Sequence, residues 1–326
     1  MQTILDTLLS PAILFFVLGS LAGYARSDLT IPEQVGKGLS LYLMAAIGIK
    51  GGVSVAAAGA DPAMLRTAIA GGLLSFGLPF LAFALLRTAG RLPRVDAGGI
   101  SAFYGSVSVV TFVTGVAVVS EQGIGPAGWM VAVMAIMETP GILAGLLLAR
   151  GNLRSLPRAP NPEGIGQHSI WREVLLNGPV VVLVGSFGIG LVTGPQGFVQ
   201  VSPFFDGMFR GVLCLFLLEM GLRAATRLRE ARALTPNLAV LAIVIPLLNA
   251  AIGFAAAAVL GLDADTATVF MLLCASASYI AAPAAIQLAA PEADVGLGLA
   301  MSLAITFPFN IILGIPLYSF VAHQLL

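Results

Sequence analysis

The sequence predicts an all-α, polytopic membrane protein: ten transmembrane helices in two inverted five-helix repeats, with discontinuous fourth and ninth helices. Composition is the first support, because 58% of the 326 residues are hydrophobic and only 10% are charged, whereas a soluble domain carries about 25% charged residues. The second is that the apolar residues form ten segments, most of them close to the roughly 20 residues that cross a bilayer. The third is that landmarks of the first five segments recur in the last five. Most of the protein surface is therefore expected to face a lipid bilayer.

Ten apolar segments, separated by polar or Gly- and Pro-rich breaks, define the order of the predicted spans. Residues 1–150 form the first repeat, residues 151–172 form a cytoplasmic linker without apolar periodicity, and residues 173–326 form the second, inverted repeat. The first, sixth and seventh segments are short for a bilayer. The predicted spans are Ala12–Tyr24, Leu39–Ala58, Ala63–Leu86, Ala97–Val119, Gly128–Ala149, Val174–Val192, Met208–Ala224, Leu238–Leu260, Thr266–Ala289 and Val295–Val321.

Five landmarks keep the same order in both halves at a nearly constant offset. Pro62 corresponds to Pro236 at an offset of 174 residues, and Pro140 corresponds to Pro308 at an offset of 168. Because each half holds five spans, an odd number, the second half is expected to cross the membrane in the opposite sense, as in many secondary transporters. The other three pairs are Pro11 with Pro179, Gly48-Ile49-Lys50 with Gly221-Leu222-Arg223, and Ser106-Val107-Ser108 with Ser276-Ala277-Ser278.

Basic residues set the expected orientation, since cytoplasmic loops carry an excess of Lys and Arg. With the N-terminus outside, every Lys and Arg except Lys50, Arg66 and Arg210 falls on the cytoplasmic side. The sequence thus predicts a multi-pass protein of the inner (plasma) membrane with both termini extracytoplasmic. No basic region precedes the first span, so this span is expected to insert and stay rather than act as a cleavable signal.

Several function classes lack support in the sequence. The formal net charge is zero, so nothing favours nucleic-acid binding, and no Walker loop supports nucleotide-driven pumping. Cys214 and Cys274 lie in apolar runs and are expected to be small packing residues without metal-ligand spacing. An intramembrane enzyme would need a nucleophile–base pair or metal ligands, and the central breaks hold no histidine. We therefore expect a protein that is not an enzyme and needs no cofactor.

The fourth and ninth spans carry matching interruptions rich in small residues and hydroxyls, at residues 103–111 and 274–283. Gly105 weakens the fourth helix, and Pro283 cannot donate a helical hydrogen bond in the ninth. A helix broken in mid-membrane has free N–H groups at the start of its second half, and these groups, together with the helix dipole, favour an anion. Such a break is tolerated only where it is buried or lines a cavity. The alternative interpretation is plain close packing, which small residues and hydroxyls also allow.

The two interruptions are therefore predicted to form one central binding site. Serine hydroxyls at this site can hydrogen-bond a substrate or help ligate a small cation such as sodium. The expected substrate-binding residues are Gly105, Ser106, Val107, Ser108, Ser276, Ala277, Ser278 and Tyr279. The expected sodium ligands are Ser106, Ser108, Thr111, Glu138, Ser276 and Ser278.

Two carboxylates fall inside predicted spans, where an ionisable residue is a functional hypothesis by default. Glu138 precedes a break expected at Thr139-Pro140 in the fifth span, and we interpret it as a cation-coupling or proton-handling group. A structural partner for a nearby dipole is the alternative. Glu219 lies one turn from Arg223, so an intrahelical ion pair accounts for it. Asn310 in the tenth span is a candidate polar lining residue.

With these segments in view, the sequence resembles the sodium-dependent bicarbonate transporter family known from cyanobacteria, over nearly the whole chain. Each motif is weak alone, and their shared order makes the resemblance specific. At the position of Glu138 the family has Asp. The motifs that carry the resemblance are Ile31-Pro32-Glu33, Ile47-Gly48-Ile49-Lys50-Gly51-Gly52, Gly105-Ser106-Val107-Ser108, Met137-Glu138-Thr139-Pro140, Phe209-Arg210-Gly211 and Ala275-Ser276-Ala277-Ser278-Tyr279-Ile280.

The resemblance implies a secondary active transporter that couples sodium to the uptake of bicarbonate or a similar small anion by an elevator-like movement. It implies a mobile core from spans three to five and eight to ten, and a scaffold from spans one, two, six and seven. It also implies a homotrimer and a PII-like regulatory protein on the cytoplasmic side. The residues that match the family's anion and sodium site by position are Gly105, Ser106, Ser108, Ser276 and Ser278.

One departure from the family pattern bears on the coupling ion. Cyanobacterial members have an acidic residue where this chain has Tyr279, and the change removes a hard-oxygen ligand for sodium. A second hypothesis therefore keeps the architecture and changes the chemistry, to a proton-coupled small carboxylate transporter or cation exchanger that uses Glu138. A third is a regulatory or receptor-like membrane protein that moves no solute. Uptake that follows a sodium gradient rather than pH separates the first hypothesis from the second.

Overall fold

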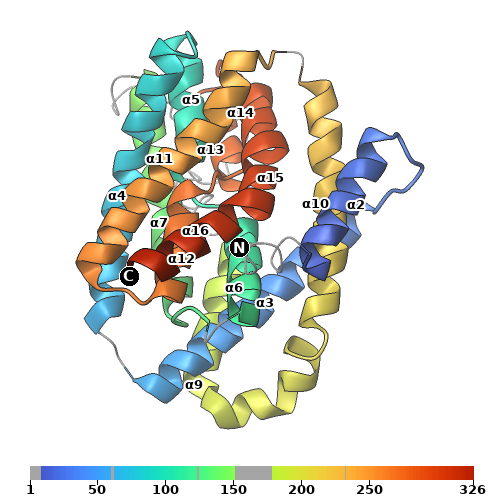
Figure 1. The fold of residues 1–326 in the computed structure, drawn as a ribbon, viewed down its shortest axis with the longest axis vertical. Helices are drawn as coiled ribbons and strands as arrows, with labels where there is room; N and C mark the ends of the chain where they lie inside the picture. Colours follow the sequence, from blue (N-terminus) through green and yellow to red (C-terminus); the bar gives the residue numbers. More distant parts are fainter. Residues whose placement is uncertain (1–8, 60–61, 123–124, 151–177, 232) are drawn as a thin grey trace, which may run out of the picture.

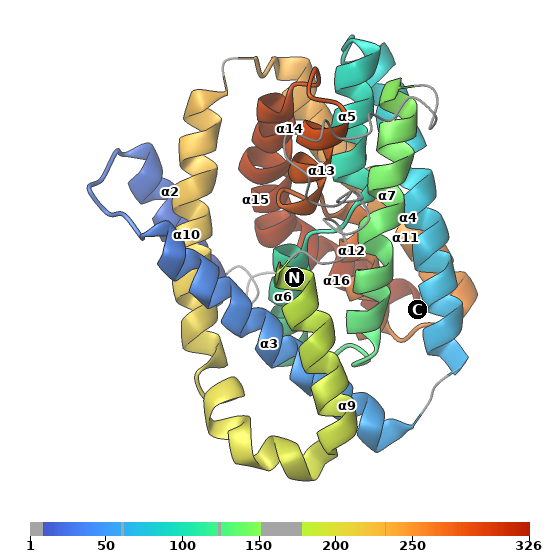
Figure 2. The ribbon, with the colours of Figure 1, turned by 180° about the vertical axis from the view of Figure 1, so that it is seen from behind.

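The structure, a computed structural model, describes residues 9–59, 62–122, 125–150, 178–231 and 233–326, and every regular element in these ranges is a helix. The predicted cytoplasmic linker, residues 151–172, lies outside them. Figures 1 and 2 show the arrangement from opposite sides. The helices are α2 (Pro11–Tyr24), α3 (Glu33–Ala58), α4 (Pro62–Thr88), α5 (Arg94–Gly105), α6 (Val109–Gln122), α7 (Met130–Arg150), α9 (Gly178–Phe205), α10 (Phe209–Glu230), α11 (Pro236–Leu260), α12 (Ala264–Ala275), α13 (Ala281–Ala289), α14 (Val295–Met301), α15 (Phe307–Phe309) and α16 (Ile315–Leu325).

Seven helical segments of the described chain are long and apolar enough to cross a membrane, and they count α5 with α6 and the whole stretch from α14 to α16 as one segment each. The protein is therefore a polytopic, all-helical membrane protein. Three predicted spans fall short of this measure for identifiable reasons. The helices α2 and α12 have only 14 and 12 residues, and at 1.5 Å per residue each reaches about 20 Å. The helix α10 carries two glutamates and four arginines among its 22 residues.

The sixth predicted span is longer than the sequence indicated. The apolar segment was expected to end at Val192, and α9 continues for 13 more residues to Phe205. The helix passes through Gly194, which has a left-handed backbone with φ of 59°. Glycine adopts this conformation at no steric cost. The following Pro195 lacks an N–H group, so the helix kinks at this point instead of stopping.

Two helix pairs stand beside a larger helical group. The helix α2 lies along α10, and α3 lies along α9, while α4, α5 and α7 pack together and α11 packs on α12 (Figures 1 and 2). The α3–α9 contact is close because Gly48 and Gly52 of α3 face the α9 backbone at Leu183 and Phe187, where a Cβ atom would overlap main-chain atoms. Small residues four positions apart bring membrane helices together in this way. The pair therefore forms a tightly joined unit.

The tenth predicted span is a continuous helix with two π-helical turns. The turns comprise residues Ser302–Thr306 and Asn310–Gly314, and they flank the short α15 that contains Pro308. A proline inside a helix removes one hydrogen bond and crowds the preceding turn, and a wider π turn relieves that crowding. Consequently α14, α15 and α16 follow one another without a break in the chain.

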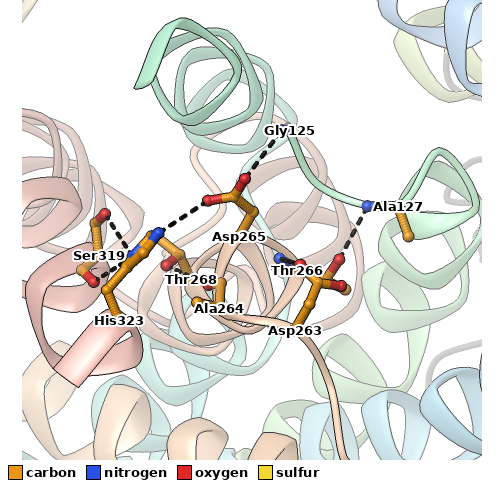
Figure 3. Close-up of polar contacts among 9 residues, drawn as sticks. All are labelled: Gly125, Ala127, Asp263, Ala264, Asp265, Thr266, Thr268, Ser319 and His323. Atoms are coloured by element: carbon orange, nitrogen blue, oxygen red, sulfur yellow. Dashed lines mark hydrogen bonds and ion pairs between the residues drawn. The ribbon is translucent and has the colours of Figure 1, made fainter. Parts of the chain in front are cut away.

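A polar cluster fastens the ends of the helices that carry both interruptions (Figure 3). The Asp265 carboxylate, at the start of α12, accepts a hydrogen bond from the Gly125 N–H at 2.9 Å and lies 3.3 Å from His323 Nε2 in α16. Thr266 Oγ1 accepts from the Ala127 N–H at 2.9 Å. The segment between α6 and α7 is thus tied to α12, and α12 is tied to the end of the chain. His323, which had no predicted role, belongs to this structural cluster.

Candidate functional site

The interruption predicted in the fourth span is present. The helix α5 ends at Gly105 and α6 begins at Val109, and Ser106 between them has an extended backbone with φ of −85° and ψ of 146°. Ser108 starts the second half, because its hydroxyl accepts a hydrogen bond from the Thr111 N–H at 3.2 Å. A serine in this position satisfies one of the free N–H groups of a helix start. The four N–H groups at the start of α6 are therefore only partly used within the helix.

The ninth span is also interrupted, within the residues 274–283 that the sequence indicated. The helix α12 ends at Ala275 and α13 begins at Ala281. Pro283 was expected to break the helix, but it is the third residue of α13, where a missing N–H costs no helical bond. The Ser278 hydroxyl accepts from the Ala282 N–H at 3.2 Å, so this serine satisfies one free N–H group in the first turn of α13, although the residue directly before the helix is Ile280.

The two interruptions meet inside the protein. The Ser108 N–H donates to Ser276 Oγ at 2.9 Å, and the Ser278 N–H donates to the Phe103 carbonyl at 2.8 Å. All four residues are buried. Each interruption therefore supplies a hydrogen bond that the other needs, and the two segments form one connected structure.

A small cavity of about 10 Å³ lies between the interruptions. This volume suffices for about one water molecule or a small ion. Five of the ten predicted site residues line it, from both interruptions and from α7. The lining residues are Val107, Ser108, Val109, Glu138, Ser278, Tyr279, Ile280 and Ala281.

The other five predicted residues lie close by with different surroundings. Gly105 ends α5 against the α7 backbone, and Thr111 is buried in the first turn of α6. Ala277 packs into a hydrophobic cluster on another side of the chain. Ser276 uses its hydroxyl to bridge the interruptions, since it also donates to a carbonyl of α12 at 2.8 Å. Ser106 has a buried hydroxyl with no hydrogen-bond partner in the described part of the protein.

The electrostatics around the small cavity suit an ion pair. The starts of α6 and α13 both face it, through Val109 and Ala281, and a helix start carries roughly half a positive charge. Glu138 of α7, which is 4% exposed, is the one carboxylate among the lining residues that the structure describes. Two helix starts favour an anion, while a carboxylate and serine hydroxyls favour a hard cation. Groups that favour an anion and groups that favour a cation therefore surround one small volume.

Three polar residues support the ends of the broken helices, and of these only Asn310, as a candidate lining residue, was singled out from the sequence. Asn249 of α11 donates to the Tyr104 carbonyl at 3.3 Å, near the end of α5. Asn310 donates to the Ala275 carbonyl at 2.9 Å, at the end of α12. It is fully buried, so it caps a helix end instead of lining a cavity. Carbonyls at a buried helix end need such partners.

Ser75 of α4 is the third of these residues, and it explains why α7 is continuous. A break was expected at Thr139-Pro140, yet α7 runs through it. Ser75 Oγ lies 3.0 Å from the Gly141 N–H and 2.5 Å from the Met137 carbonyl, so it bridges the two groups next to the proline. It also lies 3.0 Å from the Gly105 carbonyl. One hydroxyl thus joins α4, α5 and α7. Two features of the sequence could have pointed to Ser75. It is a polar residue in an apolar span, and its offset of 174 residues from Asn249 equals the offset from Pro62 to Pro236.

We expect Ser75→Ala to lower the free energy of unfolding by about 2–3 kcal/mol, because it leaves buried groups of two helices without a partner. Thermal unfolding of the purified protein measures the effect. Thr67→Val is the matched control, since Thr67 is a fully buried residue of the same helix whose hydroxyl has no hydrogen-bond partner. Equal unfolding midpoints for the two variants would show that Ser75 does not join the helices.

A second, much larger cavity opens beside the site. It has a volume of about 1100 Å³ and lies between α2, α3 and α10 on one side and α6, α13 and α14 on the other. Tyr279 and Ile280 line both cavities. The ring of Tyr279 packs edge-on against Phe307 with centroids 5.6 Å apart. Tyr279 therefore stands between the small cavity and the large one.

The fold and this geometry define a polytopic membrane protein in which two interrupted helices meet around a buried polar cavity. Comparison with protein families matches residues 11–323 to the Na+-dependent bicarbonate transporter superfamily, and the chain belongs to that family. The resemblance found in the sequence is thereby confirmed. A search of curated proteins finds no match.

Proposed function

We propose that this protein is a secondary active transporter that takes up bicarbonate, or a similar small anion, together with sodium. The family membership supports bicarbonate and sodium as the transported species. The observation that carries the proposal is the small cavity, into which two helix starts, Glu138 and the hydroxyl-bearing Ser108 and Ser278 converge. The helix starts favour the anion, and the oxygen atoms favour the cation. In this proposal the small cavity, which has room for about one small ion in this structure, widens when the two ions bind next to each other. The ions then stabilise one another, so neither binds well alone.

Ten transmembrane helices in two inverted repeats, residues 1–150 and 173–326, are part of the same proposal. The interruptions support it, because α5 and α12 have 12 residues each and both are followed by a short extended segment. Discontinuous helices in corresponding positions of two repeats are typical of secondary transporters. The proposal places both termini outside the plasma membrane and the basic helix ends in the cytoplasm.

An elevator-like movement fits the way the helices pack. The pairs α2–α10 and α3–α9 would form the scaffold, and the group around the interruptions would form the moving core. The large cavity between these groups would then be the route to the cytoplasm, because Tyr279 of the core and Arg223 of the scaffold both line it. A homotrimer and a PII-like cytoplasmic regulator remain part of the proposal through the family resemblance alone.

Uptake of labelled bicarbonate into vesicles that contain the purified protein tests the function. We expect uptake to require an inward sodium gradient and to stop when the gradient is abolished by an ionophore. Potassium in place of sodium is the matched control, because it preserves ionic strength and charge. Uptake that persists without sodium and follows a pH gradient would reject sodium coupling.

The second candidate, a proton-coupled carboxylate transporter or cation exchanger, is favoured by one observation. Glu138 lines the small cavity and is a titratable carboxylate beside two helix starts. In such a transporter this carboxylate would carry the coupled proton.

Glu138→Gln separates the two candidates. If sodium is the coupling ion, we expect Glu138→Gln to weaken the apparent sodium affinity by about tenfold or more, because one charged ligand contributes about that much to affinity. We expect the pH profile of uptake to stay unchanged. Initial uptake rates over a series of sodium concentrations measure this. Glu121→Gln is the control, since Glu121 is an acidic residue of α6 that pairs with Arg210 at 3.2 Å away from the small cavity. A variant that keeps the sodium affinity and loses its pH dependence supports the proton-coupled candidate.

A further inference from the structure

The large cavity has the size of a pocket for an organic molecule. Its volume of about 1100 Å³ lies just above the roughly 300–1,000 Å³ that small-molecule sites occupy. A three-oxygen anion such as bicarbonate needs only a small part of this volume. The cavity therefore offers more space and more surface than an exit route for the transported anion requires.

Positive charge dominates the rim of this cavity. Arg227 and Arg229 come from the last turn of α10, and Arg26 comes from the segment after α2. Two further basic residues, Lys37 and Arg223, are paired with the two acidic lining residues: Lys37 lies 2.7 Å from Glu33, and Arg223 contacts Glu219. Among the described lining residues five cations thus stand against two carboxylates, and this excess of positive charge attracts an anion that enters from this side.

The floor of the cavity is apolar apart from Glu219, which is 3% exposed and contacts Arg223. Val110, Phe216 and Leu303 line it and are nearly fully buried, with exposures of 3%, 3% and 6%. Such a surface gives no favourable contact to a strongly hydrated small anion, which would lose hydration without replacement. It does stabilise the apolar or aromatic part of an organic molecule. A cationic rim above an apolar floor is therefore complementary to an amphipathic anion.

The backbone conformation of Arg26 is a second indication that the rim of the cavity has a function. Arg26 has φ of +58°, in the left-handed region, directly after the helix end where the Ala25 N–H donates to Leu21 O at 2.8 Å. This position is normally glycine, because a side chain there is strained. A strained, non-glycine residue at a cavity rim is an indicator of function. Arg91 has the same conformation, with φ of +54° after α4, but it does not line the cavity.

We propose that the large cavity is a binding site for a soluble, amphipathic organic anion, whose apolar body lies on the floor near Phe216 and whose phosphate or similar head group is held by Arg26 and Arg229. The ligand would fill the space between α10 and Tyr279. If the proposed transport function holds, a molecule in this position blocks both the exit of the transported anion and the movement of the core, so the site is inhibitory from the cytoplasm. Binding itself does not depend on the transport function.

Titration of the purified wild-type protein with 1-naphthyl phosphate, an aromatic phosphate that serves as a probe, tests the site without any transport. We expect saturable binding, and we expect 1-naphthol and inorganic phosphate to bind at least tenfold more weakly, since each lacks half of the complementary chemistry. Arg229→Gln and Arg26→Asn should each weaken the probe at least fivefold. Arg91→Asn is the matched control and should change the affinity for the probe less than twofold. Asn tolerates the left-handed backbone at both position 26 and position 91.

Three results would overturn the site. The first is that 1-naphthol binds as tightly as 1-naphthyl phosphate, and the second is that Arg229→Gln and Arg91→Asn bind the probe with equal affinity. The third is that the protein, placed in lipid vesicles, loses probe binding when phosphatidic acid is added, which assigns the cavity to a lipid head group. In vesicles with the probe on the cytoplasmic face, bicarbonate uptake should fall in the wild type and resist the probe in Arg229→Gln. Probe binding without any bicarbonate uptake would leave this site standing and defeat the proposed function.

Discussion

Gly141→Ala is expected to abolish transport and to destabilise the protein, although alanine is the better helix former. In an ordinary helix this change stabilises by about 1 kcal/mol. Here a Cβ atom on residue 141 would overlap the carbonyl of Gly105 and the N–H of Ser106, so the end of α5 must move away from α7. Overpacking of this kind costs about 1–3 kcal/mol. It would also move Ser106 and Ser108, and we expect a loss of sodium-driven uptake of more than tenfold.

Gly77→Ala is the matched control for that variant. Gly77 lies in α4, the neighbouring helix, and a Cβ atom there meets nothing within 4 Å. We expect wild-type uptake and an unchanged or slightly higher unfolding midpoint. The two variants are compared by labelled uptake in vesicles and by thermal unfolding in detergent. If Gly141→Ala transported at the wild-type rate, the fixed contact between α5 and α7 would not be needed for the site.

Ser106→Ala is expected to have the second largest effect, and it should separate transport from stability. The Ser106 hydroxyl is 1% exposed and has no hydrogen-bond partner in the described part of the protein. A buried hydroxyl without a partner costs about 1–3 kcal/mol, so its removal leaves the unfolding midpoint unchanged or raises it. If the hydroxyl serves a transported ion, its loss weakens that ion's affinity by a similar free energy, which is about tenfold or more.

Ser101→Ala, in the helix α5 that ends directly before Ser106, provides the control. Its hydroxyl is also fully buried, but it donates to the Gly98 carbonyl at 2.7 Å inside α5. We expect a slightly lower unfolding midpoint and unchanged sodium and bicarbonate affinities, the reverse of Ser106→Ala. The measurement is the concentration dependence of initial uptake for both ions. Identical affinities in wild type and Ser106→Ala would remove Ser106 from the binding site.

The sequence predicted the interruptions because their cause is local. Small residues, hydroxyls and Gly105 disfavour a helix wherever they occur in an apolar run, so the break at residues 106–108 could be located closely. Tertiary contacts decided the cases that failed. The Thr139-Pro140 break did not form because Ser75, from another helix, supplies the hydrogen bonds that the proline disturbs. The helix α9 packs on α3, and no local pattern of its own residues records this contact.

Sequence analysis could not predict the large cavity, for a related reason. Its walls come from residues as far apart as Arg26 and Leu303, and no repeat or motif links them. The resemblance to a family did place Ser108 and Ser278 in one site, and the structure brings both, together with Glu138, to one small cavity. It could not indicate Gly141 or Asn249, whose roles consist of fitting against and supporting the backbone of α5.

The hydrogen bond from Ser108 to Ser276 has a consequence for biosynthesis. Its two partners are 168 residues apart, so at about 5–20 residues per second the ribosome needs roughly 10–30 s to deliver the second partner after the first. During that interval the newly inserted first half exposes an unsatisfied amide within the bilayer, where such a group is costly. The nascent chain must therefore rely on water, on the insertion machinery or on a temporary contact until its own C-terminal half arrives.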